Sequence, residues 1–389
     1  MNAAPGRARP LRAPHLTNRE TERPAQQSGP TIQKVCVAAY RIPTDAHESD
    51  GTFEWDTTTL VLVEATAGEV TGIGFSYADL ATATLIDDSL ADIVIGVNAM
   101  DIPRAWIAMV HAIRNIGRPG VASMAISAID NALWDLKARL LDQPLISLLG
   151  AARDALPIYG SGGFTSYTDK RLQDQLRGWV EQGILRVKMK IGREPVRDVD
   201  RVSAVRAAIG DDAELFVDAN GAYSRKQALE LACAFSEFDV SWFEEPVSSN
   251  DLEGLRLIRD DGPPGMEIAA GEYGYDETYF RRMLDAGAVD VLQADATRCA
   301  GITGFVMADA LCQAAHIPLS SHCGPSMHLH VGCAAKTIRH AEYFHDHVRI
   351  ENMLFDGVAQ PVGGALAPDL TRPGHGLEFK RSDAEQFKL

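Results

Sequence analysis

The sequence lacks the features that would indicate a membrane span, a disulfide scaffold or a nucleic acid partner. No apolar run approaches the 18 residues that a transmembrane helix needs. Only six of the 389 residues are cysteine, and none forms a Cys-x-x-Cys pair, so we expect reduced thiols and a cytoplasmic protein. Lys and Arg number 37 against 53 Asp and Glu, which leaves a net charge of −16. A chain this acidic argues against binding to nucleic acid or to an anionic membrane.

The composition is that of a globular protein, apart from the first residues. Hydrophobic residues make up 46% and charged residues 23%, and the length suits one large domain with a smaller one. Residues 1–30 differ, because they hold five Arg and five Pro, no Lys, and only two acids, Glu20 and Glu22. An Arg-rich, acid-poor leader resembles an organellar transit peptide, but frequent proline without a helical period favours a disordered extension.

Residues 31–150 are predicted to form a small α+β domain. Two segments rich in Val, Leu and Thr, 31–42 and 58–65, are typical of strands. A polar loop, 44–57, is expected between them. The segment 121–141 places its apolar residues at helical spacing, and Gln143-Pro144 ends it.

Beyond residue 155, short apolar strands alternate with helical segments, which predicts a parallel sheet. Six or more such units in succession favour a closed barrel. The expected helices are 169–182, 194–209, 225–237, 252–259, 278–286 and 302–315. The expected strands are 156–160, 186–191, 214–220, 241–245, 267–272, 290–295, 318–322 and 349–351.

Nearly every predicted strand closes on an ionisable residue. These residues are Lys190, Asp218, Glu244, Glu272, Asp295, His322 and Glu351. Their spacing is close to the roughly 31 residues per unit of an eight-unit barrel of about 250 residues. Because the barrel interior is apolar, charged side chains belong at its mouth, on the face that holds barrel active sites.

The segment Arg186–Ile191 places two lysines on one face of a strand. Lys188 and Lys190 alternate with apolar residues, as in a half-exposed strand with solvated lysines. In a barrel strand, however, the lysine face must be the interior. Two ammonium groups at the mouth are then expected to lower each other's pKa, which would help one act as a base.

Three carboxylates close successive strands. Asp218, Glu244 and Glu272 could be helix caps or surface residues, but at similar depth they would repel each other without a cation. An all-carboxylate set suits Mg²⁺ or Mn²⁺ rather than Zn²⁺. Asn220 shares the face of Asp218 and is expected to reach the same site.

Asp295 and His322 close the next two strands. A carboxylate one strand away can hold the imidazole, fix its tautomer and stabilise its charged form. This placement favours a catalytic role for His322 over a structural one. His328 and His330 could chelate Zn²⁺, but no further ligands support that, and Cys323 is expected only to pack.

These motifs in this order resemble the enolase superfamily, mandelate racemase subgroup. The motifs are Lys-x-Lys, Asp-x-Asn, Glu-Glu-Pro, Gly-Glu, Asp and Ser-His, and the segment ISAIDNALWDLKARLLDQPLISLLG resembles the family's junction between cap and barrel. The resemblance implies a modified (β/α)₇β barrel at 151–351, an α+β cap at 31–150, and a C-terminal segment, 352–389, that returns to the cap. It also suggests a homo-oligomer.

The resemblance also implies roles for the residues. Mg²⁺ would lie on Asp218, Glu244 and Glu272, and Lys190 and the His322–Asp295 pair would be the acid/base groups. Lys188 would bind the substrate carboxylate, and Glu351 would hydrogen-bond the enolate oxygen. The family usually has two glycines after the sixth strand, where this chain has Ala300-Gly301. The muconate cycloisomerase subgroup fits less well, because its second base is a lysine.

Such a site abstracts a proton α to a carboxylate. The first hypothesis is dehydration of a sugar acid to a 2-keto-3-deoxy acid, since the polar segment 44–57 suits a hydroxyl-rich ligand. The second is racemisation or epimerisation of a 2-hydroxy acid by the same residues. The third is a catalytically silent barrel with a binding role, and a zinc hydrolase barrel is disfavoured because 156–163 lacks His-x-His.

Overall fold

The computed structural model describes residues 29–389, so almost all of the predicted leader lies outside the described residues. The chain begins with an antiparallel sheet of three strands, β1 (Lys34–Ser49), β2 (Glu54–Ala67) and β3 (Val70–Tyr77). Helix α4 (Val121–Leu140) packs on this sheet at very short range, because a Cβ on Gly72 would lie 2.2 Å from the backbone nitrogen of Leu136. The cap also contains the short helices α1 (Leu80–Leu85), α2 (Ala91–Val94), α3 (Ile102–Ala112) and α5 (Leu145–Leu149).

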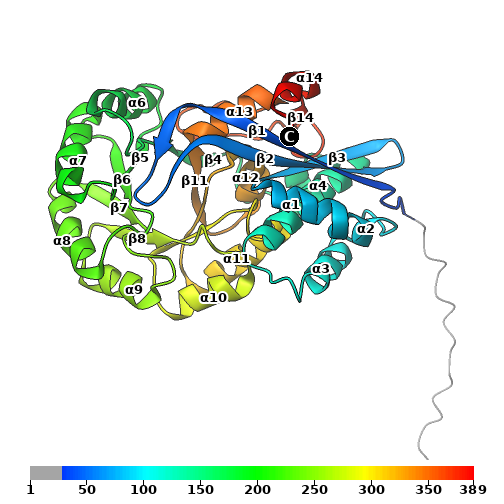
Figure 1. Ribbon diagram of the computed structural model, residues 1–389, viewed down its shortest axis with the longest axis horizontal. Coiled ribbons are helices and arrows are strands. Elements are labelled where there is room, and N and C mark those ends of the chain that lie inside the picture. The colour runs from blue at the N-terminus through cyan, green and yellow to red at the C-terminus, as the bar shows by residue number, and fades with distance from the viewer. Residues whose placement is uncertain (1–28) are drawn as a thin grey trace, which may run out of the picture.

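The second unit is a closed parallel barrel, seen beside the cap in Figure 1. Adjacent strands pair in sequence order, and β11 pairs with β4 to close the ring. The strands are β4 (Leu156–Gly162), β5 (Arg186–Lys190), β6 (Glu214–Asp218), β7 (Val240–Glu244), β8 (Glu267–Ala270), β9 (Val291–Ala294), β10 (Leu319–Ser321) and β11 (Ile338–Phe344). The helices are α6 (Asp169–Glu181), α7 (Pro195–Ile209), α8 (Arg225–Ser236), α9 (Leu252–Asp261), α10 (Glu277–Asp285), α11 (Gly301–Ala315), α12 (Pro325–Ala334) and α13 (His345–Leu354). The predicted barrel class is confirmed.

Large apolar side chains fill the barrel below its mouth. Tyr159, Phe216, Trp242, Ala269 and Val291 form one buried cluster contributed by five strands. The opposite faces of the strands pack against the surrounding helices. Because the interior is filled, polar side chains can gather only where the strands end.

The sequence interpretation of the eighth strand is wrong. The strand β11 is Ile338–Phe344, and the predicted strand 349–351 lies inside helix α13. The segment 338–344 contains Arg339, His340 and Glu342, so it does not form an apolar run. This segment forms a strand because it pairs with β10 on one side and with β4 on the other, where the barrel closes. Such pairing depends on residues that are far apart in the sequence.

The predicted polar loop at 44–57 is mostly a β-hairpin. β1 runs on to Ser49 and β2 begins at Glu54, so only the four residues between them form the tip. Figure 1 shows this hairpin reaching from the cap across the barrel.

The C-terminal segment returns to the cap. It contributes β12 (Phe355–Asp356), β13 (Ala365–Leu366), β14 (Glu378–Phe379) and α14 (Arg381–Ala384). The last residue, Leu389, donates its backbone N–H to the carbonyl of Ala39 in β1, and Arg139 of α4 donates to the carbonyl of Leu377. Among residues 29–389, no helix has the length and apolar character needed to cross a membrane.

Candidate active site

A cavity of about 410 Å³ lies at the C-terminal mouth of the barrel, beneath the β1–β2 hairpin. The barrel lines it with Lys190, Asn220, Glu272, Asp295 and His322, which are five of the residues selected from the sequence. The cap covers it with residues of the hairpin and of β3, including Asp50, Phe53, Trp55 and Tyr77. The cavity is therefore a site shared between the two units.

The three predicted metal ligands come together. Asp218, Glu244 and Glu272 are buried, and each offers an oxygen within 4.8 Å of the others. Glu272 Oε2 is buried without a hydrogen-bond partner. Burial and the neighbouring Asp218 raise the pKa of Glu244 to about 8. The carboxylates thus crowd together in a buried place, and a divalent cation would supply further positive charge to offset their repulsion.

Both predicted lysines point into this cluster. Lys188 Nζ lies 2.6 Å from Glu244 Oε1 and 3.6 Å from Asp218 Oδ2, and Lys190 Nζ donates to Asp218 Oδ2. Burial lowers the pKa of Lys188, but Glu244 and other carboxylates raise it more. Burial and Lys188 lower the pKa of Lys190, but Asp218 raises it above its usual range. The expectation of lowered lysine pKa values is therefore wrong for the metal-free protein, because the carboxylates outweigh the second ammonium group.

The predicted histidine–carboxylate pair is formed. His322 Nδ1 lies 2.8 Å from Asp295 Oδ2, and His322 Nε2 lies 3.4 Å from Glu272 Oε2. Burial lowers the pKa of His322, but Glu272 and Asp295 raise it in net. Because Asp295 accepts from Nδ1, Nε2 is left as the nitrogen that faces the cavity.

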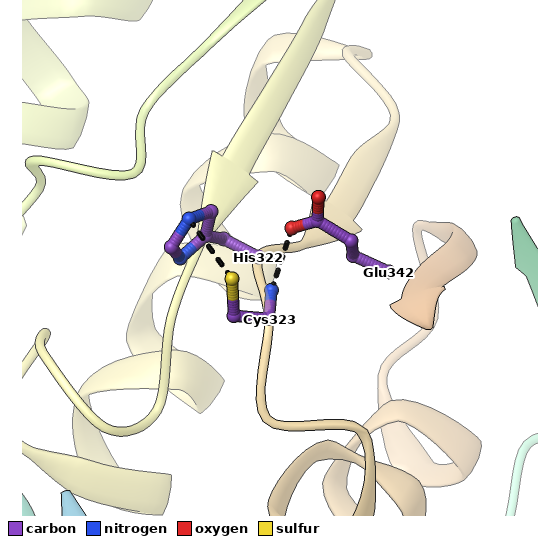
Figure 2. Close-up of side chains that lie close together, drawn as sticks. All are labelled: His322, Cys323 and Glu342. Carbon is purple, nitrogen blue, oxygen red and sulfur yellow. Dashed lines mark hydrogen bonds between the residues drawn. The ribbon is translucent and has the colours of Figure 1, made fainter. Parts of the chain in front are cut away.

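Cys323 also belongs to this group, although the sequence suggested only a packing role. Figure 2 shows its thiol facing the ring of His322, and the Sγ lies 3.2 Å from Nε2. Its backbone N–H donates to Glu342 Oε2 at 2.7 Å. The chain at Cys323 has a φ of +49°, so the turn after β10 presents His322 and the thiol side by side.

Glu342 holds the eighth-strand position that the sequence interpretation gave to Glu351. It lies in the middle of β11, fully buried, with Oε1 2.8 Å from Lys188 Nζ and 2.5 Å from Ser161 Oγ. Glu351 instead lies in α13. Its carboxylate accepts from Tyr77 Oη at 3.3 Å and from the backbone N–H of Ser326 at 3.1 Å. The prediction that Glu351 closes the eighth strand is therefore wrong, because that strand is β11.

Asn220 and Arg298 complete the mouth. Asn220 lies just beyond β6 at a φ of +46°, and its Oδ1 is buried without a hydrogen-bond partner. Arg298 was not predicted to belong to the site, and its Nη1 lies 3.3 Å from both the backbone carbonyl oxygen and the Oε1 of Glu272. In the sequence, only its position three residues after Asp295 indicates that Arg298 lies near the site. Its contact with Glu272 is long-range, because it joins the ends of two different barrel strands.

The hairpin tip lies directly on the barrel. A Cβ on Gly51 would lie 2.3 Å from the carbonyl oxygen of Ala219 and 2.8 Å from that of Ile191, at the ends of β6 and β5. Only glycine allows this approach without a shift of the backbone. Thr52 Oγ1 also donates to the carbonyl of Asn220 at 3.3 Å, so the tip is held over the cavity.

Fold and site together define a barrel enzyme with a capping domain and a cluster of three carboxylates at the mouth. Two family models match the chain. The model described as mandelate racemase/muconate lactonizing enzyme, N-terminal domain, matches residues 19–150, and the model described as enolase C-terminal domain-like matches residues 171–384. The protein belongs to the mandelate racemase/muconate lactonizing enzyme family of the enolase superfamily.

Individual relatives agree with this assignment. The chain is 34% identical over 365 residues to 3,6-anhydro-alpha-L-galactonate cycloisomerase of Streptomyces coelicolor, covering 90% of this chain and 98% of that protein. It superposes on a mandelate racemase/muconate lactonizing enzyme-like protein from Rubrobacter xylanophilus with a TM-score of 0.91 and 53% identity, covering 92% and 100%. It superposes on L-talarate/galactarate dehydratase of Salmonella typhimurium, liganded with Mg and L-lyxarohydroxamate, with a TM-score of 0.87 and 28% identity, covering 95% of each chain.

Proposed function

We propose that this protein is a Mg²⁺-dependent dehydratase of a sugar acid. The reaction would remove the α-proton of the carboxylate substrate and expel the β-hydroxyl group as water, and the resulting enol would become a 2-keto-3-deoxy acid. The observation that carries the proposal is that Lys190 and the His322–Asp295 pair line one cavity together with Glu272 of the carboxylate cluster. A dehydratase needs this combination of two proton-transfer groups and a binding site for the carboxylate.

Asp218, Glu244 and Glu272 would hold the Mg²⁺. Their all-oxygen donor set suits this ion, and Glu272 Oε2, which makes no hydrogen bond, would supply one ligand atom. Mg²⁺, or Mn²⁺ in its place, would neutralise negative charge that develops on the substrate carboxylate as the α-proton leaves.

Lys190 and His322 would carry the protons. Lys190 extends from β5 and His322 follows β10, so they approach the cavity from different strands of the ring. One would take the α-proton while the other protonates the departing hydroxyl group. General acid–base catalysis contributes about 10²–10⁴-fold. Since enzymes lower barriers by about 8–23 kcal/mol, charge stabilisation must supply most of the rest.

Lys188, Asn220 and Glu342 would complete the site. Lys188 would place its charge beside the substrate carboxylate, and the Asn220 amide, whose Oδ1 is unpartnered, would bond a substrate hydroxyl group. We propose Glu342 in place of Glu351 as the carboxyl group beside the enolate oxygen, because it belongs to the last barrel strand and contacts Lys188.

The hydroxyl-rich substrate class rests on two observations. The hairpin contributes Asp50, Thr52, Thr57 and Thr58 to the cavity wall, which are hydrogen-bonding groups suited to several hydroxyls. The Salmonella relative is named for talarate and galactarate, both sugar diacids. Cycloisomerisation of an anhydro-sugar acid is a second candidate, since the Streptomyces relative with that name aligns over nearly its full length.

A library of aldonic, aldaric and anhydro-aldonic acids, incubated with the protein and Mg²⁺, tests the proposal. We expect a 2-keto-3-deoxy acid from at least one aldonic or aldaric acid, and no product with Lys190→Ala or His322→Ala. A product formed only from an anhydro acid would favour the cycloisomerase. Deuterium exchange at the α-carbon without loss of water would indicate a racemase or epimerase instead.

A further inference from the structure

A second group of metal-ligating side chains lies outside the candidate active site. Asp45 and Glu48 belong to β1, near the tip of the hairpin, and His345 begins α13 directly after β11. Each offers one ligand atom, and these atoms all lie within 4.8 Å of one another. The group therefore joins the cap hairpin to the barrel at the end of its last strand.

Glu48 carries the strongest indication of a missing ligand. Its side chain is fully buried, and Oε1 has no hydrogen-bond partner among the described residues. Oε2 accepts only the indole N–H of Trp55, at 2.9 Å. The strongest charge acting on it is that of another acid, Asp346, which is also fully buried and is itself paired with Arg349 at 2.7 Å. A buried carboxylate beside a like charge is costly unless a cation compensates it.

The other two ligand atoms are spaced as in a metal site. His345 Nε2 and Asp45 Oδ2 are hydrogen-bonded to each other at 3.2 Å, and Asp45 Oδ1 lies 3.4 Å from Arg171 Nη2. With metal–ligand bonds of about 2.0–2.1 Å, tetrahedral ligand atoms lie about 3.3–3.4 Å from each other. The side chains of Asp45 and His345 are 39% and 24% exposed, so an ion could enter from solvent.

We propose that Asp45, Glu48 and His345 form a second divalent-cation site that fastens the β1–β2 hairpin to the barrel. The imidazole nitrogen with two carboxylate oxygens suits a transition-metal ion such as Mn²⁺ or Zn²⁺ better than Mg²⁺ or Ca²⁺, which take oxygen ligands. The site is independent of the carboxylate cluster, because it shares no residue with Asp218, Glu244 and Glu272.

Binding there would act on the cover of the active site. Asp50, Phe53 and Trp55 of the same hairpin line the catalytic cavity. Neighbouring contacts already dock the hairpin on the β4–α6 connection, since Thr165 donates its backbone N–H to the Ser49 carbonyl at 2.8 Å. A cation between β1 and α13 would add a further attachment and reduce opening of the hairpin.

Equilibrium dialysis of the full chain with Mn²⁺, after removal of metals with EDTA, tests the proposal. We expect two bound ions in the wild-type protein and one in either Asp218→Asn or His345→Ala, with none tightly bound in the double variant. His47→Ala is the matched control, since this exposed hairpin histidine pairs with Glu54 at 3.8 Å and is outside the group. It should keep both ions. Asp45→Asn provides a second, solvent-exposed variant should His345→Ala fold poorly.

Hydrogen exchange gives an independent readout. In the Asp218→Asn background, Mn²⁺ should slow amide exchange in residues 45–58, and adding His345→Ala should abolish that slowing. The proposal is overturned if His345→Ala binds as many ions as the wild type, or if Asp218→Asn binds none. A single wild-type ion that is lost in His345→Ala but kept in Asp218→Asn would support this site while refuting the proposed catalytic one.

Discussion

Replacing Lys188 by Met should destabilise the metal-free protein strongly, and more so at high pH. The fully buried ammonium group lies 2.6 Å from Glu244 and 2.8 Å from Glu342, with Asp218 at 3.6 Å. At an effective dielectric constant of about 20, each of the two closer pairs gives roughly 6 kcal/mol of attraction. Desolvation of the ions offsets much of this, and breaking a buried pair from one side costs about 3–5 kcal/mol. We expect a loss in that range at pH 8.

The pH dependence follows from the pKa directions. Burial raises the pKa of Glu342, but Lys188 lowers it more and holds it well below its usual value. The pairing therefore stabilises the wild-type protein at any pH above the pKa that Glu342 has in the unfolded chain. This stabilisation is lost as the pH falls through the lower pKa that Glu342 has in the folded protein. The folded-state pKa of Lys188 is raised, so its contribution is complete at any pH below its unfolded value. In the variant, a carboxyl group must take up a proton to remain buried. Protonating this carboxyl group costs about 1.4 kcal/mol more for each pH unit above its pKa in the unfolded chain. The destabilisation caused by Lys188→Met should therefore be about 3 kcal/mol smaller at pH 6 than at pH 8.

Urea unfolding in EDTA at the two pH values measures this loss. Lys226→Met, on the exposed surface of α8, is the control and should change stability by less than about 0.5 kcal/mol. A loss below about 1 kcal/mol at pH 8, or an equal loss at both pH values, would refute the assignment of Lys188 as the buried counter-charge of the carboxylates.

Three further predictions concern the site. Asp295→Asn should lower kcat about 10²–10⁴-fold with a small change in KM, because the Nδ1 of His322 loses its carboxylate partner. Steady-state kinetics at saturating Mg²⁺ would measure both constants, and an unchanged kcat would contradict the prediction. Gly51→Ala should lower Tm and raise KM, because its Cβ would meet the carbonyl oxygen of Ala219 at 2.3 Å. Gly68→Ala is the control, because it strains an open turn of positive φ without touching the barrel. Equal KM values in the two variants would contradict the role of Gly51 in docking the hairpin. Mg²⁺ at 100 times its Kd should stabilise the protein by about 2.7 kcal/mol, and calorimetry should find no such gain in Asp218→Asn.

Much of the barrel could be predicted from local sequence. Strands such as Glu214–Asp218 and Val240–Glu244 are mostly apolar, end in a charged residue and are followed by a helical segment. Each of these signals is short-range, and the repeat aligns the charged residues at one end of a parallel ring. The carboxylate cluster and the His322–Asp295 pair follow from that alignment, because neighbouring strand ends must meet.

The fold class and the residues at the barrel mouth could be inferred from the amino-acid order alone, because both depend on periodic local patterns. Three features depend instead on long-range contacts. Glu342 became the eighth-strand acid because β11 is recruited by pairing with β4 and β10. The lysine pKa values rose because the carboxylates gathered around them outnumber the ammonium groups. The hairpin joined the active site because Gly51 allows it to touch the ends of strands more than 100 residues away in the chain. Such contacts depend on chain closure and close approach, which no local pattern records.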